Sequence, residues 1–224
     1  MKTYFLAPDS DLTRNIINFD RKYKKRDFTY DGSTYSGAIA ITNGTPDDIM
    51  TYLLCANLNG EQVTSIFKPE EGTRYGSING LFDIIGPNVN TLLIVMDQEN
   101  EPLEIITQHI ERILTENGCE ISRENKDKIL TYNCTKGPIS FRLIAVINGL
   151  NQIITEKHCI EDHLIYAGNI RCDGDSKRTW MHLTQTQRDE VIASIVKASR
   201  RKIMELFPQQ FEAIGLFKER CRIN

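Results

Sequence analysis

Short apolar runs and stretches of helical spacing alternate along the middle of the chain. Three segments have the pattern of strands, as continuous apolar runs or as alternating β-rich residues, at 37–42, 62–68 and 92–96. Three segments have helix patterns, at 45–57, 77–85 and 102–117. Because strands that alternate with helices pair through right-handed crossovers, this order predicts a parallel α/β layer structure.

The rest of the chain extends this pattern. A further strand is predicted at 139–147, a short helix at 160–167 and a longer helix at 186–206. We expect an N-terminal extension over 1–36, an α/β core over 37–167 and a helical segment over 168–224. The predicted fold is a central, mostly parallel sheet flanked by helices, with extra helices at the C-terminal end.

The turn after the first predicted strand carries several helix-start signals. Thr45 is suited to cap the helix, Pro46 to its first position, and Asp47 and Asp48 to its first turn. Backbone N–H groups at a helix start favour phosphate, so the turn at 43–45 is a candidate site for a small phosphate or a nucleotide. No G-x-x-x-x-G-K pattern follows, which argues against an ATPase.

The strongest candidate for chemistry follows the run at 92–96. Asp97 and Glu99 come directly after this strand, and open parallel sheets bind ligands at the carboxyl ends of their strands. If the backbone stays extended there, the two carboxylates point the same way. Two hard oxygen ligands suit Mg²⁺ or Mn²⁺. The alternative interpretation is an ordinary acidic turn.

Composition and charge narrow the classes of function. A net charge of −3 over 224 residues excludes a globally basic nucleic-acid binder, although basic runs at 21–26 and 200–202 permit a local basic face. No apolar stretch approaches the about 20 residues of a membrane helix, and the N-terminus lacks a signal-peptide pattern. We therefore expect a cytoplasmic protein without membrane association. The six cysteines form no C-x-x-C pair and are expected to be free thiols.

Several features occur in a characteristic order. A strand ends in a polar–glycine pair (Asn43 and Gly44), a helix begins Thr-Pro-Asp-Asp, and two further units lead to a strand that ends in Asp-x-Glu. This order resembles the Toprim fold of topoisomerases, bacterial primases and overcoming-lysogenization nucleases. The later segment 157–165 is similar to an element found downstream in Toprim-related families, so the resemblance covers roughly 37–167.

The resemblance implies an Mg²⁺ (or Mn²⁺) site that supports cleavage of nucleic-acid phosphodiesters or nucleotidyl transfer. The family places a Glu after the first strand, where this chain has Asn43, and an Asp-x-Asp after the third, where it has Asp97 and Glu99. Other candidate metal ligands are Asp47, which falls where many members of the family carry an acid, and Glu161 and Asp162, either of which would restore the missing negative charge. The candidate phosphate-binding residues are Gly44, Thr45, Lys68 and Arg74.

Three interpretations remain open from the sequence. The first is a metal-dependent, Toprim-like nuclease, which could work with a partner ATPase. The second is a degenerate Toprim-like subunit that binds nucleic acid or an ATPase, because the Asn43 side chain is neutral and cannot act as a general base. The third is an α/β protein that binds a nucleotide at the turn 43–45. The amphipathic helix near the C-terminus is a candidate surface for homo-oligomer contacts.

Overall fold

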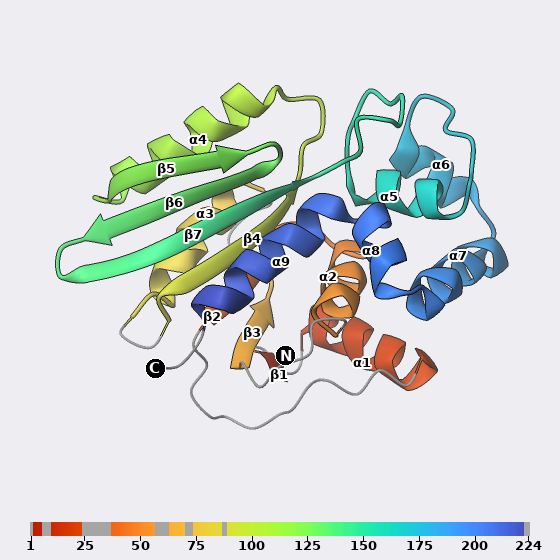
Figure 1. Cartoon of the computed structure of the whole chain (residues 1–224), viewed down its shortest axis with the longest axis horizontal. Coiled ribbons are helices and arrows are strands. Elements are labelled where there is room, and N and C mark those ends of the chain that lie inside the picture. Colours follow the sequence, from red (N-terminus) through yellow and green to blue (C-terminus); the bar gives the residue numbers. More distant parts are fainter. Residues whose placement is uncertain are drawn as a thin grey trace.

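Strands between residues 2 and 148 join one mixed sheet in the computed structural model, which describes residues 2–5, 10–23, 37–56, 63–69, 74–86 and 89–221 (Figure 1). The strand order is β1-β3-β2-β4-β7-β6-β5. The strands are β1 (Lys2–Phe5), β2 (Gly37–Ile41), β3 (Val63–Phe67), β4 (Thr91–Asp97), β5 (Glu120–Lys126), β6 (Ile129–Lys136) and β7 (Ile139–Asn148). Strands β1, β3, β2, β4 and β7 run parallel, whereas β6 is antiparallel to β7 and to β5.

Helices cover both faces of this sheet. Those described are α1 (Asp11–Tyr23), α2 (Asp47–Ala56), α3 (Gly76–Asn79), the 3₁₀ helix η1 (Gly80–Asp83), α4 (Leu103–Glu116), α5 (Ile160–Ala167), α6 (Ser176–His182), α7 (Gln185–Lys197), α8 (Arg200–Leu206) and α9 (Pro208–Arg220). Helix α9 lies along β4 and β7, while α5 to α8 gather beyond the carboxyl end of β7 (Figure 1). The fold is therefore α/β, as predicted, with a mixed sheet between helical layers.

Strand β4 lies at the centre of the sheet and is buried along its whole length. Leu93 and Val95 pack into the core under α1, α2 and α9, whereas Leu92, Ile94 and Met96 pack into the core under α4. Such a strand needs apolar residues at every position, because successive side chains point to opposite faces. The unbroken apolar run that predicted a doubly buried strand is explained by this position.

The predicted strands at 37–42, 62–68, 92–96 and 139–147 are confirmed as β2, β3, β4 and β7, although Gln62 lies outside the described residues. The single helix predicted at 186–206 is wrong. It is divided into α7 and α8, because Ser199 breaks the helix and its side chain accepts a hydrogen bond from the Lys202 N–H. The hairpin of β5 and β6 was not predicted, and it makes the sheet mixed.

Both terminal segments pack against the core. Strand β1 pairs with β3 in parallel, and α1 packs against α2. At the other end, α9 approaches β2 so closely that a Cβ atom on Gly37 would lie 2.4 Å from Cys221 Sγ. Only glycine fits at this crossing. Residues from 1–36 and 168–224 therefore complete the layers built by 37–167.

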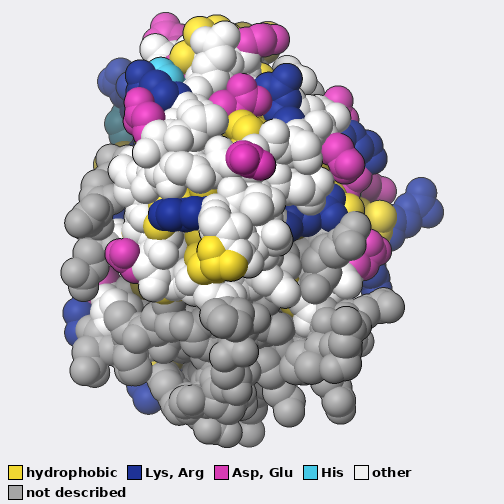
Figure 2. All heavy atoms as spheres, turned by 90° about the vertical axis from the view of Figure 1, so that its left-hand side faces the viewer, with side chains coloured by type: hydrophobic (Ala, Val, Ile, Leu, Met, Phe, Trp, Pro, Cys, Tyr) yellow, Lys and Arg dark blue, Asp and Glu magenta, His cyan; other side chains and the backbone are white. Residues whose placement is uncertain are grey.

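Charges of both signs are mixed on the end of the molecule that carries the β6–β7 turn. Figure 2 shows Lys and Arg side chains interspersed with Asp and Glu over the described part of this face. The basic run at 200–202 lies in α8 and is exposed, with Glu205 paired to both Arg201 and Lys202. Of the run at 21–26, residues 24–26 lie outside the described residues.

The structure bears on two features considered from composition, the cysteines and possible membrane helices. All six cysteines are free, as predicted. Within the described ranges, no helix is both long enough and apolar enough to cross a membrane.

Candidate active site

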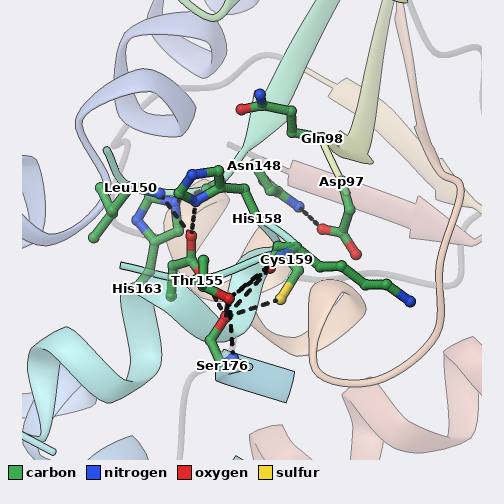
Figure 3. A network of polar contacts seen from close by, with 12 residues as sticks. Asp97, Gln98, Asn148, Leu150, Thr155, His158, Cys159, His163 and Ser176 are labelled. Atoms are coloured by element: carbon green, nitrogen blue, oxygen red, sulfur yellow. Dashed lines mark hydrogen bonds and ion pairs between the residues drawn. The ribbon is translucent and has the colours of Figure 1, made fainter. Parts of the chain in front are cut away.

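The polar ends of neighbouring parallel strands meet at one edge of the sheet. Strand β4 ends with Asp97, the adjacent β7 ends with Asn148, and α2, which follows β2, begins with Asp47. The Asn148 Nδ2 group donates to Asp47 Oδ1 over 2.8 Å and to Asp97 Oδ1 over 3.0 Å; Figure 3 shows the latter bond. One amide group therefore joins two carboxylates from distant parts of the chain.

Glu161, in the first turn of α5, adds a third carboxylate beside this pair. The N–H of the preceding residue, Ile160, donates to Asp97 Oδ1 over 3.1 Å and so fixes the start of α5 against the end of β4. Asp47 and Asp97 are each 3% exposed and Glu161 is 4% exposed. We call Asp47, Asp97 and Glu161 the carboxylate cluster.

The three acids disfavour one another's ionisation. Burial, assisted by the charges of Glu161 and Glu99, raises the pKa of Asp97 to about 7 against the opposing hydrogen bond from Asn148. Burial also raises the pKa of Asp47 well above its ordinary value, assisted by Asp97 and Glu161. The pKa of Glu161 is raised as well, mainly by burial. Near neutral pH, the cluster therefore needs protons or a cation to balance its charge.

Lys177 provides a positive charge beside the cluster. Partial burial alone would lower the pKa of this amine, but Glu161, Asp97 and Glu99 together raise it above its ordinary value. The side chain comes from the first turn of α6, a helix capped by Asp175, which accepts from the Arg178 N–H. A protonated lysine next to buried carboxylates is suited to face an anionic group that enters the site.

A chain of hydrogen bonds fixes the orientation of the Asn148 amide. Gln210 Nε2, on α9, donates to Asn148 Oδ1 and to His163 Nε2, each over 2.9 Å. Burial lowers the pKa of His163 to about 3, so the ring is neutral, and its Nδ1 donates to the Leu206 carbonyl over 2.6 Å. Because Asn148 Oδ1 is already an acceptor for Gln210, its Nδ2 group must face the carboxylates.

Glu99 is placed differently from the prediction. The backbone is not extended there, because Glu99 has a φ of 58° and pairs with His158 in an isolated antiparallel bridge. Its N–H donates to the His158 carbonyl over 2.7 Å. The expectation of an extended Asp-x-Glu segment is therefore wrong. The Glu99 charge nevertheless lies near enough to raise the pKa of Asp97.

Asp162 belongs to a separate network, although it is the next residue after Glu161. Its carboxylate accepts from the Leu150 N–H over 2.9 Å, contacts His158 Nδ1 at 2.6 Å and accepts a close hydrogen bond from Ser176 Oγ. Leu150, His158 and Ser176 converge on the side of the site away from Asp97 (Figure 3). Both carboxylate oxygens thus have partners within the chain, and the structure gives Asp162 a linking role between α5, α6 and the loop after β7.

The predicted phosphate-binding turn lies directly beside the cluster. Thr45 Oγ1 donates to Asp48 Oδ2 over 3.0 Å and accepts from Asn15 Nδ2 over 2.8 Å. Gly44 is exposed, and no described atom lies within 4 Å of the position of an added Cβ. Asn43 is half-buried, and its Nδ2 atom has no hydrogen-bond partner among the described residues. Access to this turn is therefore open at Gly44, while the Thr45 hydroxyl is already engaged.

The two predicted basic residues have different surroundings. Lys68 is exposed, and its charge acts on Asp48. Arg74 is partly buried, with Nη1 paired to Glu101 Oε1 at 2.7 Å and Nη2 donating to the Gln98 carbonyl over 2.7 Å. The guanidinium therefore ties the loop after β4 to the loop before α3, and its charge is balanced by Glu101.

No pattern in the sequence indicated that Lys177, Asn148 or Gln210 belong to the site. They lie near Asp97 only because the tertiary structure brings β7, α6 and α9 to the carboxyl end of β4.

Across the described ranges, no three or more His, Cys, Asp or Glu side chains are already arranged to hold a metal ion. No protein-family model, curated protein or solved structure matches this chain.

Proposed function

We propose that this protein is a divalent-cation-dependent nuclease that cleaves nucleic-acid phosphodiesters at the carboxylate cluster, with a divergent Toprim-like core. The observation that carries the proposal is the burial of three mutually repelling acids at the carboxyl ends of parallel strands. A fold built for stability alone would replace or neutralise such a group, because uncompensated buried charge is costly. Functional sites are where this cost is commonly retained.

The donor set fits a hard cation that is shared with the substrate. Mg²⁺ prefers oxygen ligands, keeps several waters and is often held by only one or two carboxylates together with substrate phosphates. Asp97 and Asp47, which share the Asn148 amide, could supply two such ligands, and Glu161 a third charge. A site of this kind does not require three protein ligands to be arranged beforehand. Manganese has the same ligand preference.

The chain's own groups then have distinct roles. Asp97 and Asp47 would bind Mg²⁺ or Mn²⁺, and Asn148 would hold their carboxylates in place. Lys177 would bind a non-bridging phosphate oxygen and Gly44 would leave room for the backbone of the substrate. A bound divalent cation supplies an activated water and stabilises charge on the phosphoryl group. Glu161 replaces, in charge, the acid that the Toprim resemblance expects at Asn43.

The test is a cleavage assay on plasmid, single-stranded DNA and RNA with Mg²⁺ and with Mn²⁺. Asp97→Asn should reduce cleavage at least about 1,000-fold, because cation-dependent stabilisation is worth several kcal/mol. Glu104→Gln, which removes an exposed acid on α4, serves as the matched control and should cleave like the wild type. Equal cleavage by wild type and Asp97→Asn would overturn the proposal.

The neutral Asn43 side chain favours a second candidate function, a non-catalytic subunit that binds nucleic acid or a partner ATPase. In that case the chain should bind single-stranded DNA or RNA without cutting it. Binding should also be unchanged by chelator and by Asp97→Asn. A protein that only binds a nucleotide at the turn 43–45 would instead be stabilised thermally by that nucleotide and would cut no substrate.

A further inference from the structure

A cavity of about 500 Å³ adjoins the carboxylate cluster. Its walls come from α1, the start of α2, α6 and α7, and both Glu161 and Lys177 line it. The same two side chains interact electrostatically with Asp97. The cavity therefore shares Glu161 with the carboxylate cluster. Its volume is typical of pockets that hold one small ligand.

One part of the cavity wall is apolar and aromatic. Phe19 and Trp180 are buried and line the cavity, and Ile49 and Ile192 add aliphatic surface. Met181 lies at the mouth and is 65% exposed, which is unusual for a large apolar side chain. Aromatic and methionine side chains accept flat, polarizable groups, including nucleobases.

The rest of the wall is polar and mostly neutral or basic. Asn18 supplies an amide that can donate to and accept from the edge of a base, whereas Asn15 Nδ2 already donates to Thr45 and Asp48. Lys177 lies on the side of the carboxylate cluster, where a phosphate would be needed for the chemistry. At the outer side, Lys22 pairs with Asp189 over 2.8 Å and links α1 to α7. A cavity with an apolar part, a side-chain amide and the Lys177 amine beside the carboxylate cluster matches a nucleotide better than a purely apolar or purely anionic ligand.

We propose that this cavity is a nucleoside subsite, which holds the base and sugar of the nucleotide whose phosphate lies at Lys177. The identification of the reacting phosphate rests on the proposed nuclease function, whereas the affinity for a nucleoside does not. A base inside a duplex would have to leave its stack to enter the cavity. The substrate class is therefore single-stranded nucleic acid or an unpaired end.

The chain carries a built-in reporter of occupancy. Trp180 is its single tryptophan and lines the cavity. Titration of the full chain with adenosine, cytidine, guanosine and uridine, and with their 5′-monophosphates, should produce a saturable change in tryptophan fluorescence in the presence of chelator. Inorganic phosphate and ribose 5-phosphate should produce none, because neither contains a base.

Two exposed methionines provide a matched pair of variants. Met181→Glu places a charge at the mouth of the cavity and should weaken binding of the monophosphates at least about tenfold. Met204→Glu makes the same change on α8, outside the cavity and at a residue that is 48% exposed, and should bind like the wild type. Asn18→Asp, at an exposed position on the opposite wall, should weaken binding in the same direction. Far-UV circular dichroism checks that each variant is folded.

The outcomes separate this inference from the proposed function. Nucleoside binding without metal-dependent cleavage would support the subsite and contradict the nuclease. Metal-dependent cleavage with no fluorescence change, and with equal activity of Met181→Glu and Met204→Glu, would overturn the subsite and leave the nuclease standing. An equal response to inorganic phosphate would also overturn it, because the site would then recognise only the anion.

Discussion

Glu161 and Asp162 are neighbours in sequence, yet their carboxylates have different surroundings: Asp162 is surrounded by hydrogen-bond partners, whereas Glu161 is close to other acids. Asp162 is fully buried and has hydrogen-bond partners on both oxygens, from Leu150, His158 and Ser176. Glu161 is also buried, but its charge raises the pKa of Asp47 and Asp97, and burial raises its own pKa. Burial of an acid alone therefore does not mark a functional site. What distinguishes the cluster is that its acids repel one another, and the charge of Lys177 offsets this repulsion only in part.

The sharpest test of this comparison is to replace an aspartate by asparagine in each of the two surroundings, at Asp162 and at Asp97. At pH 8, Asp162→Asn should lower the free energy of unfolding by about 3 kcal/mol, because an amide places a donor against groups that already donate. Asp97→Asn should raise it by about 2 kcal/mol, because it removes a buried charge and keeps an acceptor for Asn148 and Ile160. Urea denaturation measures both values. A loss of stability in both variants would mean that the cluster is not strained.

The next effect concerns the amide that holds the cluster together. Gln210→Leu removes the donor that fixes the Asn148 carbonyl, so the amide becomes free to rotate and present its oxygen to the carboxylates. Loss of a residue that orients ligands typically costs 10- to 100-fold, and we expect about this loss in Mn²⁺ affinity, measured by calorimetry, and in cleavage.

Gln209→Leu is the control for that variant. Gln209 is the adjacent residue on α9, and its Nε2 donates to the Gly149 carbonyl over 2.7 Å instead of to Asn148. Gln209→Leu should lose about 1 kcal/mol of stability with its one hydrogen bond, and Gln210→Leu about twice as much, because it loses two. Only Gln210→Leu should lose metal affinity. Equal metal affinity in the two variants would remove Gln210 from the positioning network.

The third effect is a dependence of stability on pH that differs between the two regions. Asp97 has a pKa of about 7 in the folded chain, against about 4 for an unperturbed aspartate, so the folded state keeps its proton between these values. The contribution of the cluster to stability is therefore present at pH 4 and is lost as pH rises toward 7. Mg²⁺ should raise the melting temperature by about 3 °C at pH 8 and much less at pH 5.

In Asp97→Asn, the same addition of Mg²⁺ should change the melting temperature little at either pH. Thermal unfolding at each pH, measured without Mg²⁺ and with Mg²⁺ at about ten times its dissociation constant, tests this expectation. Stabilisation of the same size at pH 5 and pH 8 would show that the cation binds elsewhere.

The sequence predicted the acidic residues Asp97 and Asp47 of the site but not the residues around them, for identifiable reasons. Asp97 was placed correctly because β4 is buried on both faces and its apolar run is unmistakable, and Asp47 because its helix start is a local signal. Strand β5, with the sequence EISRENK, is an exposed edge strand with a single large apolar residue. Its sequence therefore lacks the alternation of apolar and polar residues that predicts a strand. Asn148 reaches the site through the pairing of β7 with β4, and Lys177 and Gln210 reach it through the packing of α6 and α9, which local patterns do not encode.

The smallest expected effect decides what Glu99 does. Its charge raises the pKa of Asp97, so Glu99→Gln should lower that pKa and move the acid limb of the cleavage pH profile to lower pH by a few tenths of a unit. The maximal rate should be unchanged, because the backbone at Glu99 turns away from the extended path that would align the two carboxylates. If Glu99 were itself a metal ligand, the maximal rate would instead fall at least about tenfold at every pH. Glu104→Gln should move neither quantity, so a shift confined to Glu99→Gln assigns this residue an electrostatic role on Asp97.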